Sequence, residues 1–143
     1  MNKPIAAQEL PRLSRNLLAQ APAALPSAPP RAVPDDDALV RTTLQRYRAA
    51  YDDLDAGSAR AVWPAVDQGA LARAFESLAS QRLTFDACSV EVAGRDARAV
   101  CHGSARYVPK IGSREPRVEP RVWTFTLRKA GDAWQIESAR AGR

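Results

Sequence analysis

The chain has 143 residues, 11 prolines, two cysteines and a formal net charge of +5. This length suits one domain and is short for two. No apolar run reaches the roughly 18–20 residues that a membrane-spanning helix needs, and polar residues interrupt the N-terminal region where a signal peptide would be continuously apolar. We therefore expect a soluble domain with no membrane insertion by this segment and no export signal. The sequence could still be the tail of a longer protein.

The first 34 residues differ in composition from the rest. They hold seven of the 11 prolines, and the run AQAPAALPSAPPRAVP carries almost no charge. Proline- and alanine-rich runs of this kind are typical of extended linkers. We predict that residues 1–34 are a largely disordered linker and that residues 35–143 form the folded domain.

The positive charge is unevenly distributed. Residues 35–94 have six basic and ten acidic side chains, whereas residues 95–143 have 11 basic and five acidic ones. A basic region attracts acidic partners, but a nucleic-acid-binding domain also carries a recognisable reading motif. The sequence has no helix-turn-helix spacing, zinc-finger spacing or aromatic RNA-binding signature, so we predict no nucleic-acid partner.

Three helical patterns come first in the domain. An acidic run at residues 35–37 offers N-cap oxygens and favourable charge, and apolar residues then recur at three- and four-residue steps. We expect Gly57 to end this helix, because glycine is the usual residue after a helix C-terminus. Ser58 is expected to cap a short second helix, and Asp67 to cap a third, QGALARAFESLA.

The apolar period then changes to two, which indicates strands. RLTFDACSVEV and ARAVCHGSARYV are joined at AGRD. A turn centred on Gly94 and Arg95 places Cys88 directly opposite Cys101, on a face that is otherwise apolar.

The strands RVWTFTLRK and AWQIESARA form a second predicted hairpin. A turn at AGD, between these two strands, would place Trp134 opposite Leu127 and Ile136 opposite Phe125. Helices followed by a four-stranded antiparallel meander with one apolar face predict an α+β domain, its helices packed on one side of a curved sheet.

The stretches LQRYRAAYDDLDAGSARAVWPAVD, ALARAFESLASQRLTF and WTFTLRKAGDAWQIESARA resemble the nuclear transport factor 2-like superfamily, which includes the SnoaL-like domains. The resemblance covers about residues 35–143. The sequence is similar in particular to uncharacterised domains of this superfamily that follow a linker at the C-terminus of bacterial signalling proteins, including serine/threonine kinases.

The resemblance implies a cone-shaped α+β fold. In this family a strongly bent sheet wraps the long helix and leaves an apolar pocket at the wide end. Members often dimerise through the open face of the sheet, which implies a homodimer through the face of Val122, Thr124 and Thr126.

The two cysteines are expected to be structural. Facing strand positions lie ~4.5–5.5 Å apart at Cα, within the range of a disulfide, but two buried free thiols fit the apolar face equally well. Twelve residues separate Cys88 from Cys101, and the single histidine, His102, lies on the opposite face, so we predict no metal site. A disulfide would place the domain outside the cytoplasm and free thiols would place it inside.

Aromatic residues are the candidates for a ligand pocket. Phe75 and Phe125 are expected in the core. A buried Tyr or Trp needs a hydrogen-bond partner for its polar atom, or a position where that atom reaches solvent. The candidate pocket residues, which would hold a small apolar ligand at the mouth of the cone, are Tyr47, Tyr51, Trp63, Tyr107 and Trp123.

No catalytic constellation is apparent. Enzymes of the superfamily use pocket carboxylates or histidines as bases, and here only Asp86 has the strand parity to point inward. General acid–base catalysis needs a positioned group with a shifted pKa, and Asp52 and Asp53 lie on the polar flank of the first helix. Asp86 and Tyr51 are therefore the only candidates for proton transfer, and no cofactor is predicted.

The connection PKIGSREPRVEPR is strongly charged. It carries four basic residues with Glu115 and Glu119 between them. We expect a solvated loop, or else a docking edge for an acidic peptide or another subunit.

The sequence therefore favours a non-catalytic small-molecule-binding or oligomerisation and sensor module, accessory to a signalling or envelope protein. The alternative is a small cofactor-independent isomerase or cyclase acting on an apolar ring substrate in the cone.

Overall fold

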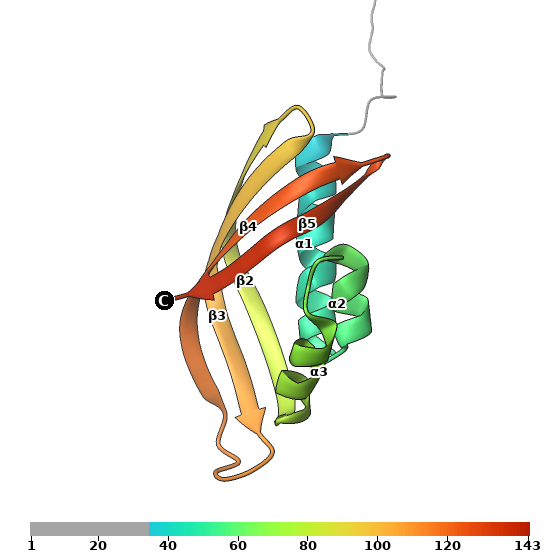
Figure 1. The fold of residues 1–143 in the computed structure, drawn as a ribbon. Coiled ribbons are helices and arrows are strands. Elements are labelled where there is room, and N and C mark those ends of the chain that lie inside the picture. Colours follow the sequence, from blue (N-terminus) through green and yellow to red (C-terminus); the bar gives the residue numbers. More distant parts are fainter. Residues whose placement is uncertain (1–34) are drawn as a thin grey trace, which may run out of the picture. The chain divides into compact units, whose positions relative to one another are not determined.

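The computed structural model describes residues 35–143, so the predictions for residues 1–34 lie outside the described part. Three helices precede four strands (Figure 1). The elements are α1 Asp36–Asp52, α2 Ala56–Val62, α3 Gln68–Glu76, β2 Leu78–Ala93, β3 Asp96–Pro109, β4 Arg117–Ala130 and β5 Ala133–Gly142.

Acidic side chains start each helix. Asp35 caps α1 as expected, because its carboxylate accepts a hydrogen bond from the Asp37 N–H at 3.0 Å, and Asp67 caps α3 in the same way. The predicted end of α1 at Gly57 is wrong. Leu54 turns the chain with a positive φ of 54°, and Asp55 then caps α2 in place of Ser58.

The four strands form one antiparallel sheet in the order β2-β3-β4-β5. Cys88 pairs with Cys101, as the first hairpin predicts. The second hairpin differs, since Leu127 pairs with Ile136 and Lys129 with Trp134. The turn comprises Gly131 and Asp132, and Gly131 adopts the left-handed φ of +64° that such two-residue turns need. Near the turn the pairing is shifted by two residues, which leaves Trp134 and Ile136 on their predicted face. A β-bulge at Glu137 then adds one more residue to the shift, so Ala139 packs against the core, and Ser138 and Arg140 lie on the outer face, opposite to the predicted alternation.

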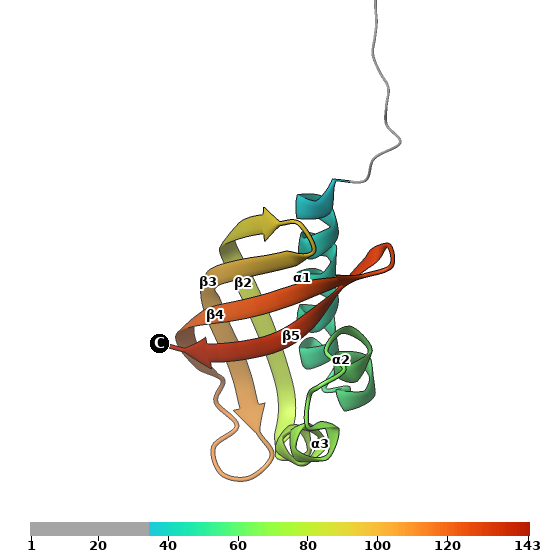
Figure 2. The ribbon, with the colours of Figure 1, turned by 45° about the horizontal axis from the view of Figure 1, so that its top comes forward.

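Two local features bend the sheet around α1 (Figure 2). A β-bulge at Asp86 interrupts the pairing of β2 with β3. Opposite the bulge, Gly103 approaches β2 so closely that a Cβ there would lie 1.7 Å from the Thr84 carbonyl oxygen. Only glycine permits this approach.

The core fills the space between the helices and the concave face of the sheet. Thr43 on α1 donates to the Trp134 carbonyl at 2.9 Å, and Asp36 accepts from the Trp134 indole at 3.2 Å. The largest fully buried side chains are Trp123, Phe125, Leu44, Leu127, Ile136, Val40, Val62 and Cys101. The helices all lie on this side, so within residues 35–143 no helix covers the outer face of the sheet (Figure 1).

Candidate functional site

Stacked and edge-on aromatic rings occupy the interior of the cone. The rings of Tyr47 and Tyr51 stack with centroids 4.3 Å apart, and Tyr47 meets Phe125 edge-on at 5.0 Å. Phe85 contacts Trp123 edge-on at 4.9 Å. Burial raises the pKa of both tyrosines because it disfavours the phenolate. Both rings are therefore neutral phenols at physiological pH.

Two of the five candidate pocket residues belong to the packed core. Tyr47 is 3% exposed and Trp123 is 2% exposed. Tyr51 and Trp63 are half-buried and pack against the same core. A ligand beside Tyr47 or Trp123 would have to displace well-packed rings.

A polar cluster lies at the end of the sheet next to α3. The Tyr107 hydroxyl donates to Glu119 at 2.9 Å, and the Arg121 guanidinium donates to the other Glu119 oxygen at 2.6 Å. Arg143 lies 3.5 Å from the same carboxylate. The hydrogen bond from Arg121, followed by that from Tyr107, lowers the pKa of Glu119. The carboxylate is thus held ionised and oriented.

The sequence predicts a solvated loop at Glu119 and Arg121, but the structure places both residues in a strand. They lie in β4, where Glu119 pairs with the buried Ala105 and shares the concave face with Trp123. The period-two alternation of Trp123, Phe125 and Leu127 continues toward the N-terminus through Arg121 and Glu119, and this continuation indicates a strand. Pro120 argues against a strand at this position, since proline is uncommon within strands.

The prediction that Asp86 points inward is wrong. Asp86 is the extra residue of the β2 bulge and is exposed, because the bulge breaks the period-two alternation on which the prediction depended. Asp52 has a structural role, since its carboxylate accepts the Leu83 N–H at 2.7 Å and an Arg48 guanidinium hydrogen bond at 2.9 Å. Within residues 35–143, no group of three or more His, Cys, Asp or Glu side chains could hold a metal ion.

The two cysteines form a disulfide. The Cys88 and Cys101 Cα atoms lie 4.0 Å apart and the sulfur atoms are bonded. Cys101 is completely buried, and Arg41 on α1 donates to the Cys88 carbonyl at 3.2 Å. The bond therefore joins β2 to β3 just beyond the bulge, where α1 also contacts the sheet.

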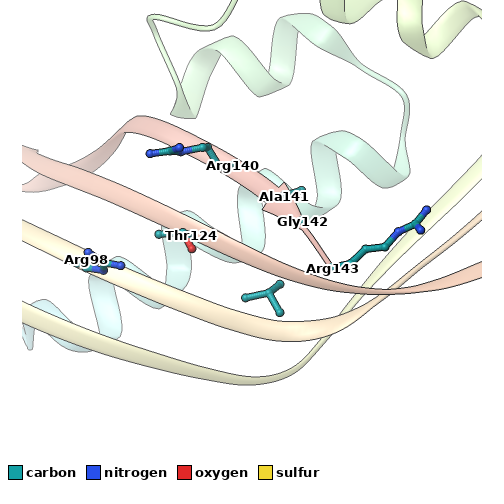
Figure 3. Close-up of a pocket in the computed structure, with 7 residues that line it drawn as sticks. Arg98, Thr124, Arg140, Ala141, Gly142 and Arg143 are labelled. Carbon is teal, nitrogen blue, oxygen red and sulfur yellow. The ribbon is translucent and has the colours of Figure 1, made fainter.

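The outer face of the sheet has two hollows of opposite charge. The basic hollow, of about 420 Å³, is lined by Arg98, Val122, Thr124, Arg140, Ala141, Gly142 and Arg143 (Figure 3). The acidic hollow, of about 360 Å³, is lined by Glu91, Asp96 and Glu137 together with Arg98 and Thr126, among others. Arg98 borders both hollows, so they adjoin on one face.

No known family model matches the sequence, and no curated protein matches it. Solved structures match it closely in fold. A nuclear transport factor 2-like superfamily protein from Salmonella enterica superposes with a TM-score of 0.65 at 14% identity, covering 76% of this chain and 92% of that one. The domain has the nuclear transport factor 2-like fold. An NTF2-like protein with a cystatin-like fold from Novosphingobium aromaticivorans matches with a TM-score of 0.58 at 17% identity, covering 74% and 80%.

An enzyme is also among the solved structures that share this fold. The hexachlorocyclohexane dehydrochlorinase LinA-type3 from Novosphingobium barchaimii matches with a TM-score of 0.62 at 8% identity, covering 75% of this chain and 85% of that chain. Identities this low establish the shared nuclear transport factor 2-like fold alone, because one fold hosts many activities. Of the described helices, none is both long and apolar enough to cross a membrane.

Proposed function

We propose that the domain is a non-catalytic assembly module that forms a homodimer through the outer face of its sheet. The observation that carries this proposal is the pair of adjoining hollows of opposite charge on a face that no described helix covers. Half-buried Val122 and Thr124 of β4 line the basic hollow. The composition of residues 1–34 supports a role as a tether, which suits an accessory domain of a signalling or envelope protein.

A two-fold contact suits this charge arrangement. In such an interface one patch meets its own copy, so each contact between two different positions occurs twice. Arg128 already pairs with Glu137 at 3.2 Å and with Asp96 at 3.4 Å. Within the described part, Glu91 and Arg140 have no ion-pair partner. Two copies can therefore pair Arg140 of each with Glu91 of the other, while Val122 and Thr124 meet at the centre.

The oligomeric state tests this proposal. Sedimentation velocity of the full chain at micromolar concentrations is expected to show a dimer, and Val122→Asp is expected to weaken it because the change places a charge at the centre of the contact. Ile111→Asp is the matched control, since Ile111 is 89% exposed in the connection after β3. A monomer at every concentration, or equal weakening by both variants, contradicts the proposal.

A second candidate function is small-molecule binding at the end of the sheet next to α3. The cluster of Tyr107, Glu119 and Arg121 favours it, because a few oriented polar groups beside aromatic rings are typical of ligand sites. An isomerase or cyclase is less well supported. Asp86 is exposed and does not face the interior. Arg121 lowers the pKa of Glu119, whereas a carboxyl that transfers protons near neutral pH needs a raised pKa.

The disulfide favours an oxidising compartment. Structural disulfides persist outside the reducing cytosol, and the bond between Cys88 and Cys101 lies against the core. We therefore propose an extracytoplasmic location. Titration of free thiols in protein isolated under native conditions, with thiols blocked at lysis, tests it, and two free thiols per chain would contradict it.

A further inference from the structure

Three arginines line the basic hollow, namely Arg98, Arg140 and Arg143, and only Arg143 among them contacts a carboxylate of the described residues. Arg41, Arg48, Arg121 and Arg128 each form an ion pair with a carboxylate. Within residues 35–143, Arg98 and Arg140 form no such ion pair and donate no side-chain hydrogen bond. Other exposed arginines, such as Arg82 and Arg106, share this property, but Arg98 and Arg140 also line one hollow together. Both guanidinium groups are therefore available to a ligand.

The sheet register brings these two side chains to one place. Arg98 on β3 pairs with Thr126, and Arg140 on β5 pairs with Thr124, so the arginines lie diagonally across β4. Figure 3 shows both side chains on either side of Thr124, whereas Arg143 extends away from them. Arg143 lies instead 3.5 Å from Glu119. No acidic residue lines the basic hollow.

This arrangement is suited to an oxyanion. The planar guanidinium presents its N–H groups as a fork that matches the oxygens of a carboxylate or phosphate, and the Thr124 hydroxyl adds a further donor. The remaining wall includes Val122 and Ala141. We propose that the basic hollow binds a small organic oxyanion, with its phosphate or carboxylate between Arg98 and Arg140 and its apolar part against Val122.

The inference extends to regulation, and this second part rests on the proposed function. The proposed dimer uses Arg140 to contact Glu91 of the second copy. An oxyanion bound at Arg140 therefore occupies the position of that carboxylate. Ligand and second copy compete for one surface, so the bound oxyanion favours the monomer.

An NMR titration tests the site itself. The probes are phenyl phosphate and benzoate, which share a ring and differ in the oxyanion, with inorganic phosphate as the minimal ligand. The protein is the full chain carrying Glu91→Gln, which weakens the proposed contact and leaves the hollow lining intact. Ionic strength is held constant with NaCl, because exposed charge interactions are screened by salt.

Saturable shifts of the Thr124 and Arg140 amides are expected with at least one aromatic probe, and the tighter probe identifies the oxyanion class. A protein that carries Arg98→Gln and Arg140→Gln in addition to Glu91→Gln is expected to bind the probe more weakly, by about tenfold or more, because two charge-assisted contacts are lost. The control carries Arg46→Gln and Arg73→Gln instead. It loses the same amount of positive charge, from α1 and α3, and is expected to bind the probe with unchanged affinity. Equal loss in both double variants, or no saturable shift, overturns the site.

Sedimentation velocity of the unmodified chain tests the competition. The dimer dissociation constant is expected to rise when the tighter probe replaces chloride at equal ionic strength. A dimer of unchanged affinity overturns the competition while the proposed self-association stands. A monomer in both salts contradicts the self-association instead, and the titration then decides the oxyanion site alone.

Discussion

Reduction of the Cys88–Cys101 disulfide is expected to destabilise the domain by a calculable amount. The cysteines are 13 residues apart in sequence, so the bond closes a loop of about 14 residues. The chain-entropy relation gives roughly 3 kcal/mol of stabilisation for a loop of this size, mainly by restricting the unfolded chain. This value is an upper estimate, because the turn at Gly94 already brings the strand ends together in any residual hairpin.

Urea denaturation with and without a reductant measures this quantity. With an m-value of roughly 1.5–2 kcal/mol/M, a loss of about 3 kcal/mol lowers the urea midpoint by about 1.5–2 M, and the m-value is expected to rise slightly because the unfolded chain becomes less compact. Cys88→Ala with Cys101→Ala controls for the reductant and is expected to be insensitive to it. A midpoint that moves by less than about 0.3 M on reduction of the native chain refutes the argument from loop closure.

Two further predictions concern the sheet and the polar cluster. Gly103→Ala is expected to destabilise the domain by on the order of 3 kcal/mol or more, because its Cβ would overlap a backbone carbonyl of β2. Gly57→Ala is the matched control and is expected to stabilise α2 by up to about 1 kcal/mol in the same urea assay; equal effects would contradict the close approach. NMR titration is expected to give Glu119 a pKa below 4.5, raised by Arg121→Gln and less by Tyr107→Phe. Because the folded pKa is lowered, the contribution of Glu119 to stability is present above pH 4.5 and is lost as the pH falls through the folded pKa; a Glu119 pKa that neither variant raises would contradict the cluster.

The parts of the fold that could be predicted from the sequence depend on local patterns. Asp35 and Asp67 are recognisable caps because each precedes an apolar helical pattern. The turn at Gly94 fixes the pairing of Cys88 with Cys101 because hairpin register follows from turn geometry. Strand parity then identifies Trp123 and its alternate neighbours as core.

The errors occur where tertiary packing overrides the local pattern. The bulge at Asp86 adjoins the close approach of Gly103 on the neighbouring strand, and nothing in the sequence around Asp86 indicates it. Leu54 adopts a positive φ although a glycine three residues later offers the cheaper turn. The sequence predicts a loop at Glu119 because the neighbouring Pro120 is uncommon within strands.

The hollows of the outer face could not be predicted from sequence alone. Arg98 and Arg140 come from β3 and β5, which do not pair with each other. Their proximity depends on the register of both strands with β4. The predicted register differs from the observed one by three residues at Arg140, because the bulge at Glu137 moves this side chain to the outer face. A charged residue on an exposed strand face is also the ordinary case, so neither arginine is conspicuous in sequence.

A charge exchange between two variants tests the proposed self-association most directly. Arg140→Glu and Glu91→Arg each place like charges at both symmetric contacts, so each variant alone is expected to sediment as a monomer. Mixed in equal amounts, the two variants restore opposite charges at both contacts, and a heterodimer with about the native affinity is expected. If the mixture sediments as two monomers while the unmodified chain forms a dimer, the contact between Arg140 and Glu91 is wrong.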